Sequence, residues 1–173
     1  MCRSAEHAFS KPCRAEIELV AGHGVVGDAH YGKTVQHRSR VSADPSQPNL
    51  RQVHLLHDEL FTELLRQGHA LRPGDIGENI TTRCVDLLSL PQGTRLLFSR
   101  GAEVELTGLR NPCRQLDGFA QGLMSALRVR GEGGEIERKA GVMAVVTKSG
   151  RVCPGDSFEI ELPALPHQPL ERV

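Results

Sequence analysis

The feature that most constrains the fold is the alternation of short apolar segments with glycine- and proline-containing turns along the chain. Turn sequences such as Pro-Gly-Asp at 73–75 and again at 154–156 separate these segments. Many short strands with frequent turns and few helices are typical of barrels and sandwiches, so the pattern predicts a mainly β domain. The expected strands lie at residues 15–20, 52–56, 76–82, 95–99, 103–109, 140–147 and 157–162.

Two segments carry helical periodicity. In residues 58–67, leucine and phenylalanine recur at helical spacing, with Asp58 or His57 as the N-cap and Gly68 at the end. A second helix is expected at about residues 112–128. A chain of 173 residues is the size of one ordinary domain.

Composition excludes several classes of protein. Lysine plus arginine equals aspartate plus glutamate at 21 each, which argues against a dedicated DNA-binding protein. With no tryptophan, one tyrosine and five phenylalanines, an aromatic RNA-binding platform is also not expected, so no nucleic-acid partner is predicted. No apolar run is long enough for a membrane helix or a signal peptide, so we expect no membrane association and a cytoplasmic location.

The five cysteines are odd in number and widely scattered, and the sequence contains no C-x-x-C. Neither a disulfide scaffold nor a four-cysteine zinc site is therefore expected. Cys84 and Cys153 stand beside turns and are interpreted as structural, buried cysteines. Cys2 and Cys13 fall in an N-terminal region that we expect to be mobile.

Cys113 is the most informative cysteine. In the sequence L-R-N-P-C-R, Asn111 is a good N-cap and Pro112 suits the first helical position. Cys113 would then lie in the first helical turn between Arg110 and Arg114, where the helix dipole and two cations favour a thiolate, the form that acts as nucleophile or metal ligand. The alternative is that Cys113 is a small buried apolar residue, which is common for a free cysteine.

Histidines and glycines suggest two further interpretations. The segment 21–32 is rich in glycine, and Asp28 and His30 in it are expected to hold a tight loop by hydrogen bonds; a ligand-binding loop is the alternative. His54 and His57 form an H-x-x-H pair, but on a strand they point to opposite faces, which argues against shared zinc ligation.

Basic residues recur late in the chain and flank a glycine-rich segment. Arginine suits bidentate phosphate recognition, whereas the intervening glutamates favour a solvated loop of mixed charge. Both interpretations stay open from the sequence. The set comprises Arg110, Arg114, Arg128, Arg130, Arg138 and Lys139.

Several motifs together resemble the MOSC domain, the molybdenum cofactor sulfurase C-terminal domain, in its small stand-alone bacterial form. They include G-V-V-G-D-A-H-Y-G (24–32), R-Q-V-H-L-L (51–56), P-G-D-I-G-E-N-I-T (73–81), V-E-L-T-G-L-R-N-P-C (104–113) and A-G-V-M-A-V-V (140–146). The resemblance covers residues 15–162, which we expect to form the domain between a flexible segment 1–14 and a frayed tail 163–173. An insertion-like stretch lies at about 34–49.

The resemblance implies a mixed, mostly antiparallel β-barrel with a few short helices. It implies a role in handling the molybdenum cofactor (molybdopterin) or metal-bound sulfur, with Cys113 carrying sulfur or ligating the metal. Partners would be enzymes of molybdenum cofactor biosynthesis or cofactor acceptors; pyridoxal phosphate is not expected on this chain alone. The expected cofactor-binding residues are Arg110, Arg114, Arg138, Lys139, Asn111, Asp28, His30 and Asn79.

Three functions remain open at this point. The first is a cofactor-binding or sulfur-carrier module that uses Cys113. The second is a molybdenum-dependent reductase of N-hydroxylated compounds, which would need separate electron-transfer partners. The third is a non-catalytic adaptor that uses the barrel as a scaffold.

Overall fold

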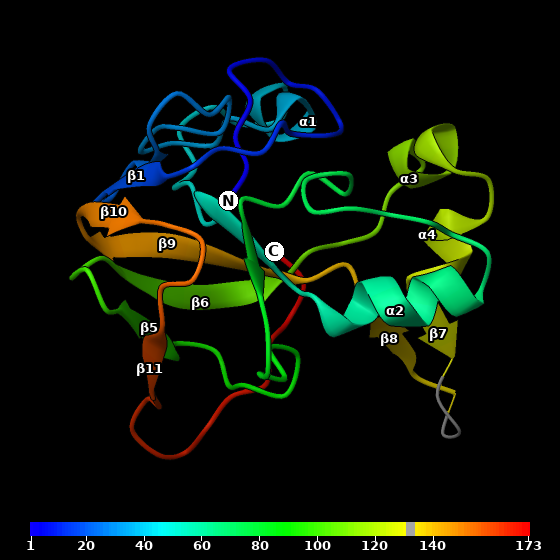
Figure 1. The fold of residues 1–173 in the computed structure, drawn as a ribbon. Helices are drawn as coiled ribbons and strands as arrows, with labels where there is room; N and C mark the ends of the chain where they lie inside the picture. Colours follow the sequence, from blue (N-terminus) through cyan, green and yellow to red (C-terminus); the bar gives the residue numbers. More distant parts are fainter. Residues whose placement is uncertain (131–133) are drawn as a thin grey trace.

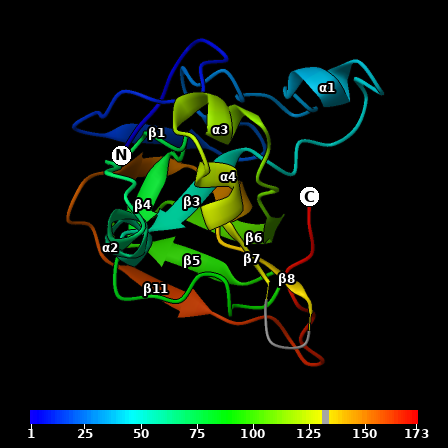
Figure 2. The same ribbon diagram turned by 90° about the vertical axis from the view of Figure 1, so that its right-hand side faces the viewer.

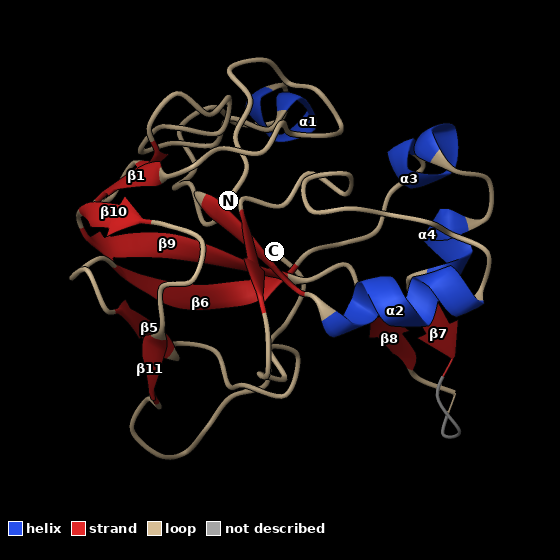
Figure 3. Ribbon diagram, viewed as in Figure 1, coloured by secondary structure: helices blue, strands red, loops and turns tan. Residues whose placement is uncertain are grey.

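The computed structural model describes residues 1–130 and 134–173 and confirms the mainly β architecture (Figures 1 and 3). The principal sheet consists of β3 (Val53–His57), β4 (Ile80–Thr82), β5 (Arg95–Phe98), β6 (Glu103–Leu109), β9 (Val142–Lys148) and β11 (Phe158–Glu161). Their spatial order is β11-β5-β6-β9-β3-β4. β3 and β4 are parallel, whereas the other neighbours in this sheet are antiparallel, so the sheet is mixed as expected.

A second sheet has the order β10-β1-β2 and covers one side of the first. It consists of β1 (Ile17–Val20), β2 (Gly24–Val25) and β10 (Gly150–Val152). The backbone N–H of Gly22 donates to the carbonyl of Val146 at 2.8 Å, which joins the turn after β1 to β9. The two sheets curl into a half-barrel (Figure 1). Buried aliphatic side chains such as Leu19, Leu55 and Val104 form its core.

The helix expected at residues 58–67 is confirmed as α2 (Glu59–Arg66), with Asp58 at the N-cap. Its Leu60 and Leu64 are fully buried in a second apolar cluster that also includes Leu56 of β3. β3 therefore has apolar core on both faces, since Leu55 packs into the first cluster and Leu56 into the second. This is why all its residues except the last are buried. Figure 2 shows α2 from its end, next to β3 and β4.

The prediction of a single helix at residues 112–128 is wrong. The structure has two short helices there, α3 (Gln115–Phe119) and α4 (Leu123–Ala126). Ala120 is extended, and Gly122 adopts a φ of +83°, a left-handed conformation that interrupts a helix and is accessible mainly to glycine. Leu116, Leu123 and Leu127 nevertheless lie in the second core cluster, whereas Phe119, which has the same helical spacing, is 43% exposed.

Two other expectations about strands need correction. The strand expected at 76–82 is only the three-residue β4, because the backbone before it turns at Gly74 and Gly77, both with positive φ. The glycine-rich basic segment contains an unexpected antiparallel hairpin, β7 (Arg128–Arg130) and β8 (Ile136–Arg138). Residues 131–133 of that segment lie outside the described residues.

Both end segments lie against the sheets. Cys2 and Cys13 form an antiparallel bridge, and Cys2 is fully buried while Cys13 is exposed. Near the other end, Leu170 is 8% exposed, and Arg172 forms a parallel bridge with Leu109 at the end of β6. The stretch 34–49 contains the short helix α1 (Arg38–Val41). Among the described residues, no helix has the length and apolar character needed to cross a membrane.

Candidate functional site

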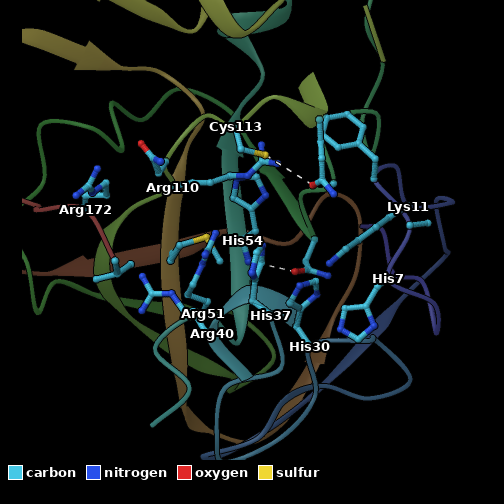
Figure 4. A pocket seen from close by; sticks show the side chains of 18 residues that line it. His7, Lys11, His30, His37, Arg40, Arg51, His54, Arg110, Cys113 and Arg172 are labelled. Carbon is cyan, nitrogen blue, oxygen red and sulfur yellow. Dashed lines mark hydrogen bonds between the residues drawn. The ribbon is translucent and has the colours of Figure 1, made fainter. Parts of the chain in front are cut away.

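A cavity of about 460 Å³ lies between the N-terminal segment, the stretch around α1 and the loop that follows β6 (Figure 4). No aspartate or glutamate side chain is among the described residues that line it. The charge of this lining is therefore strongly positive, which favours an anionic ligand. The cationic residues are Lys11, Arg40, Arg51, Arg110 and Arg172, and they lie with His7, His30, His37, His54 and Cys113.

Arg110 immediately follows β6 and is fixed by its backbone N–H, which donates to the carbonyl of Gly141 at 3.0 Å. Its guanidinium carbon lies 5.9 Å from the ring centre of Phe9. The Nη1 atom is buried and has no hydrogen-bond partner. Burial lowers the pKa of Arg110, and the nearby Cys113 partly offsets that effect. Arg110 therefore offers a buried N–H group without an acceptor, in a cavity whose other charged side chains are also cationic.

Cys113 lies before α3 and not in its first turn, so the predicted placement in the first helical turn is wrong. The N-cap of α3 is Arg114, and Asn111 lies farther upstream. Cys113 is half-buried, and its thiol donates to Oε1 of Gln115 at 3.7 Å. Its positive surroundings come from guanidinium groups, since Cys113 interacts electrostatically with Arg110 and Arg51. Figure 4 shows Arg110 and Cys113 at the same end of the cavity.

Arg51 precedes β3 and is the second cation near Cys113. The pKa of Arg51 is lowered to about 10 by burial first and then by the positive charges of Arg110 and Arg40, while Cys113 acts in the opposite direction. A guanidinium group whose pKa is lowered by neighbouring cations is stabilised by an anion placed beside it. The arrangement is therefore suited to a thiolate, a phosphate or an oxyanion.

Asp28 is a fully buried carboxylate behind the cavity wall. It accepts hydrogen bonds from Lys11 Nζ at 2.7 Å, from His30 Nδ1 at 3.1 Å and from Asn79 Nδ2 at 2.9 Å. Burial alone would raise the pKa of Asp28, but the hydrogen bond from His30 and the charge of Lys11 hold it well below the usual range. Asp28 thus orients Lys11 and His30, which both line the cavity.

His54 lies on β3 in the wall of the cavity and is buried. Its Nε2–H donates to the carbonyl of Ala140 at 2.7 Å. Burial and the nearby Arg110 hold the pKa of His54 well below its ordinary value, so the ring stays neutral. His57 does not line the cavity, and the described residues contain no group of three or more histidine, cysteine or acidic side chains arranged for a metal.

The structure brings some of the expected site residues together and separates others. Cys113, Arg110, Asn111, Asn79 and His30 line the cavity, and Asp28 supports it from behind. Arg114, Arg138 and Lys139 are not among the lining residues.

The hairpin β7–β8 explains why the later cations lie elsewhere. Lys139 forms an ion pair with Glu63 of α2 at 2.7 Å, and Arg138 lies at a separate surface hollow beside Leu109. The carbonyl of Gly141 accepts a hydrogen bond from the backbone N–H of Arg110, but the chain before Gly141 turns away into the hairpin.

Four cations of the cavity were not among the site residues expected from the sequence: Lys11, Arg40, Arg51 and Arg172. Lys11 and Arg172 belong to end segments that carry no periodic pattern, and Arg40 lies in the insertion-like stretch. Arg51 had one usable signal, since it stands directly before a buried strand within the quoted motif R-Q-V-H-L-L. The exposed Cys84 also differs from the expected buried position.

Comparison with known proteins agrees with this fold. The family model described as the MOSC domain matches residues 27–159. The chain is 28% identical over 155 residues to the "Putative metal-sulfur cluster biosynthesis proteins YuaD" of Bacillus subtilis, covering 79% of this chain and 76% of that protein. The crystal structure of Bacillus subtilis YuaD is similar with a TM-score of 0.76 at 26% identity, covering 94% of this chain and 93% of that one. YiiM from Escherichia coli shares the fold, with a TM-score of 0.62 at 15% identity over 96% of this chain and 70% of that chain.

Proposed function

Because the chain belongs to the MOSC domain family, we propose that its cavity binds the molybdenum cofactor or a related phosphate-bearing metal–sulfur intermediate, and that Cys113 supplies the reactive sulfur. The family and the metal-sulfur name of the YuaD relative support a role of this class. The molecule acts in this proposal as a cofactor-binding or sulfur-carrier module.

One observation carries the proposal: the buried, unpartnered Nη1 of Arg110 in the cavity that also contains Cys113. A buried polar atom without a partner costs free energy in the ligand-free protein. An anionic oxygen of a ligand removes that cost by accepting the hydrogen bond, and guanidinium groups are well suited to phosphate. A neutral ligand would leave the positive charges of the cavity uncompensated.

These residues fit the molybdenum cofactor. Arg110 and Arg51 would hold the phosphate, Lys11 would add positive charge, and the Cys113 sulfur would face the metal. When bound, the cofactor supplies a metal centre that accepts sulfur and exchanges electrons. Phe9 and Met143 give the cavity apolar wall area for the non-phosphate part of the ligand.

A sulfur-carrier role needs only Cys113 and a persulfide donor. The Cys113 thiolate attacks the outer sulfur of the donor persulfide, and the sulfur–sulfur bond of the donor breaks. The proton of the outer sulfur passes to the departing sulfur, so the donor leaves as a thiol. Cys113 then carries one additional sulfur as a persulfide anion. Arg110 and Arg51 stabilise this anion because both interact electrostatically with Cys113.

The first experiment is a titration calorimetry measurement with inorganic pyrophosphate as the probe. We expect Arg110→Gln to weaken binding by about 10- to 100-fold, since hydrogen bonds to charged groups contribute about 1.5–3 kcal/mol. Arg138→Gln is the matched control, because Arg138 also has a buried unpartnered nitrogen but lies outside the cavity. Undetectable pyrophosphate binding, or equal affinity for wild type and Arg110→Gln, would reject the anion site.

A second experiment tests the role of the thiol. After treatment with a small-molecule persulfide, mass spectrometry should find one added sulfur on Cys113, and Cys113→Ser should lose that modification while Cys84→Ser retains it. Metal analysis of protein made in a host that synthesises the cofactor tests the cofactor-binding role separately. Absence of both persulfide and metal would favour the adaptor alternative.

A further inference from the structure

Cys2 and Cys13 face each other across the short antiparallel bridge of the N-terminal segment. The backbone N–H of Arg3 donates to the carbonyl of Pro12 at 3.2 Å, and that of Arg14 donates to the carbonyl of Met1 at 2.8 Å. These two bonds flank the cysteine pair, so Cys2 and Cys13 occupy a non-hydrogen-bonded position of the antiparallel ladder. At such positions the Cα atoms are about 4.5 Å apart, which lies within the range that disulfides span.

The two sulfur atoms are already in contact, with Sγ of Cys2 and Sγ of Cys13 separated by 3.0 Å. Their surroundings differ sharply. Cys2 is fully buried, and burial together with the hydrogen bond to Cys13 raises the pKa of Cys2 to about 12. Cys2 therefore remains a thiol, either sulfur can donate the hydrogen bond that joins the two, and the exposed Cys13 meets solvent.

From this arrangement we propose that Cys2 and Cys13 are a redox modification site, which a peroxide converts to a disulfide and a thiol reductant restores. The proposal does not depend on the function proposed for Cys113. It also differs from a scaffold of permanent disulfides, because the exposed sulfur remains open to reduction.

The chemistry proceeds in two balanced steps. The Cys13 thiol loses its proton, the resulting thiolate attacks one peroxide oxygen, and the oxygen–oxygen bond breaks. Cys13 becomes a sulfenic acid, and the departing hydroxide takes up the proton that the thiol lost and leaves as water. The Cys2 sulfur then attacks the Cys13 sulfur, the sulfur–oxygen bond breaks, and the departing hydroxide takes the Cys2 proton as a second water. In total, two thiols and one hydrogen peroxide give one disulfide and two waters.

The pair closes the loop that supplies one wall of the cavity. Within that loop, His7, Phe9 and Lys11 line the cavity, and the backbone N–H of Lys11 donates to the carbonyl of Gly74 at 2.8 Å. A disulfide would restrict the unfolded chain at this loop and so stabilise the folded state, in which the loop forms the wall. Oxidation would thereby stabilise the segment that carries Lys11.

Peptide mapping provides a direct test. After treatment with hydrogen peroxide at low excess and alkylation of the remaining thiols, trypsin cuts after Arg3 and Arg14 but not at the Lys11–Pro12 bond. We expect the peptide ending at Arg3 and the peptide of residues 4–14 to appear as one linked species that a thiol reductant separates. The oxidised protein should also show a Tm at least about 4 °C above that of the reduced protein.

Variants make the result specific. Cys13→Ser should abolish both the linked species and the rise in Tm, whereas Cys84→Ser, which removes another exposed thiol, should change neither. Cys113→Ser should also retain the link, which separates this proposal from the one made for Cys113. Oxidation of Cys13 to sulfinic acid without a link to Cys2, or a link from Cys13 to any other cysteine, would overturn the proposal.

Discussion

Asn79 Nδ2 donates a hydrogen bond of 2.9 Å to Oδ2 of Asp28, 51 residues away in the chain. The same amide nitrogen donates to the carbonyl of Cys2 at 3.1 Å, and the amide oxygen accepts from the backbone N–H of His54 at 3.1 Å. One buried side chain thus joins the N-terminal segment, the glycine-rich segment and β3. Because these hydrogen bonds connect segments that form the walls of the cavity, Asn79 is a positioning residue.

The Asp28–Lys11 ion pair predicts a large loss of stability for Asp28→Asn. Lys11 and Asp28 have side chains 5% and 0% exposed, so removing the carboxylate leaves a buried ammonium group without a counter-ion. We expect a loss of about 3–5 kcal/mol, measured by urea denaturation at neutral pH. Asp58→Asn is the control: its pair with Arg83 is exposed, and the expected loss is below about 1 kcal/mol. Equal effects of the two substitutions would contradict this interpretation.

The same carboxylate predicts a dependence on acid pH. Because the folded-state pKa of Asp28 is lowered, its contribution to stability is fully present above its unfolded-state pKa of about 4 and is lost as the pH falls below that value. The difference in unfolding free energy between wild type and Asp28→Asn should therefore be constant near neutrality and shrink in acid. Urea denaturation curves of both proteins between neutral and acid pH measure this difference. A difference that grows in acid would contradict a lowered pKa of Asp28.

His54 predicts a second, milder loss of stability, which begins as the pH falls below about 6.5. The folded protein keeps His54 neutral, whereas the unfolded chain protonates it below about pH 6.5, so the unfolded state gains protons as the pH falls. One such histidine lowers stability by at most about 1.4 kcal/mol per pH unit below that value. His54→Gln should reduce the slope of unfolding free energy against pH between about pH 6.5 and 5. An unchanged slope would mean that His54 is protonated in the folded protein.

Occupation of the cavity should protect Cys113 from alkylation. Cys113 lines the cavity and is half-buried, so an anion bound near Arg110 restricts access of iodoacetamide to its sulfur. We expect pyrophosphate to slow labelling of Cys113 several-fold, as followed by mass spectrometry. Labelling of the exposed Cys84 should keep the same rate and serves as the internal control. Equal slowing of both cysteines would indicate a general effect of the salt.

Gly141 should tolerate no side chain. It has a φ of +89°, and an added Cβ would collide with the carbonyl oxygen of Leu55 and lie 2.9 Å from Nε2 of His54. Gly141→Ala should destabilise the protein by at least about 2 kcal/mol, from left-handed strain plus overpacking. Gly155→Ala separates the two causes, because Gly155 has the same φ but open space around it, and about 1–2 kcal/mol is expected. Thermal and urea unfolding of both variants provide the comparison.

Local patterns predicted the elements whose structure depends on neighbours in sequence. Leu60 and Leu64 occur at helical spacing and lie on the buried side of α2, and the alternating residues around Val104 form β6. The sequence did not predict the break between α3 and α4, because a glycine can also occur inside a helix. The break follows from the left-handed φ that Gly122 adopts in the fold. The short strands of the hairpin β7–β8 carry mostly charged residues, and their apolar residues are the half-buried Val129 and the exposed Ile136, so no local pattern predicted them.

The sequence predicted those residues of the candidate site that lie together in one short segment. Arg110, Asn111 and Cys113 follow β6 in succession and all reach the cavity. Lys11 and Arg51 reach it through tertiary packing, which no local pattern encodes. Arg138 lies close to Gly141 in sequence, yet the hairpin carries it away from the cavity.

The pairing of β3 with β9 places Val53 opposite Ala144, and the pairing of β1 with β10 places Ile17 opposite Val152. Such distant partners must find each other before the sheets gain stability, so this topology is expected to fold slowly for its size. The cavity draws its walls from the beginning, middle and end of the sequence and so exists only once those searches are complete. An anion that binds there should leave the folding rate unchanged and slow unfolding, because it recognises a surface that the folding transition state lacks.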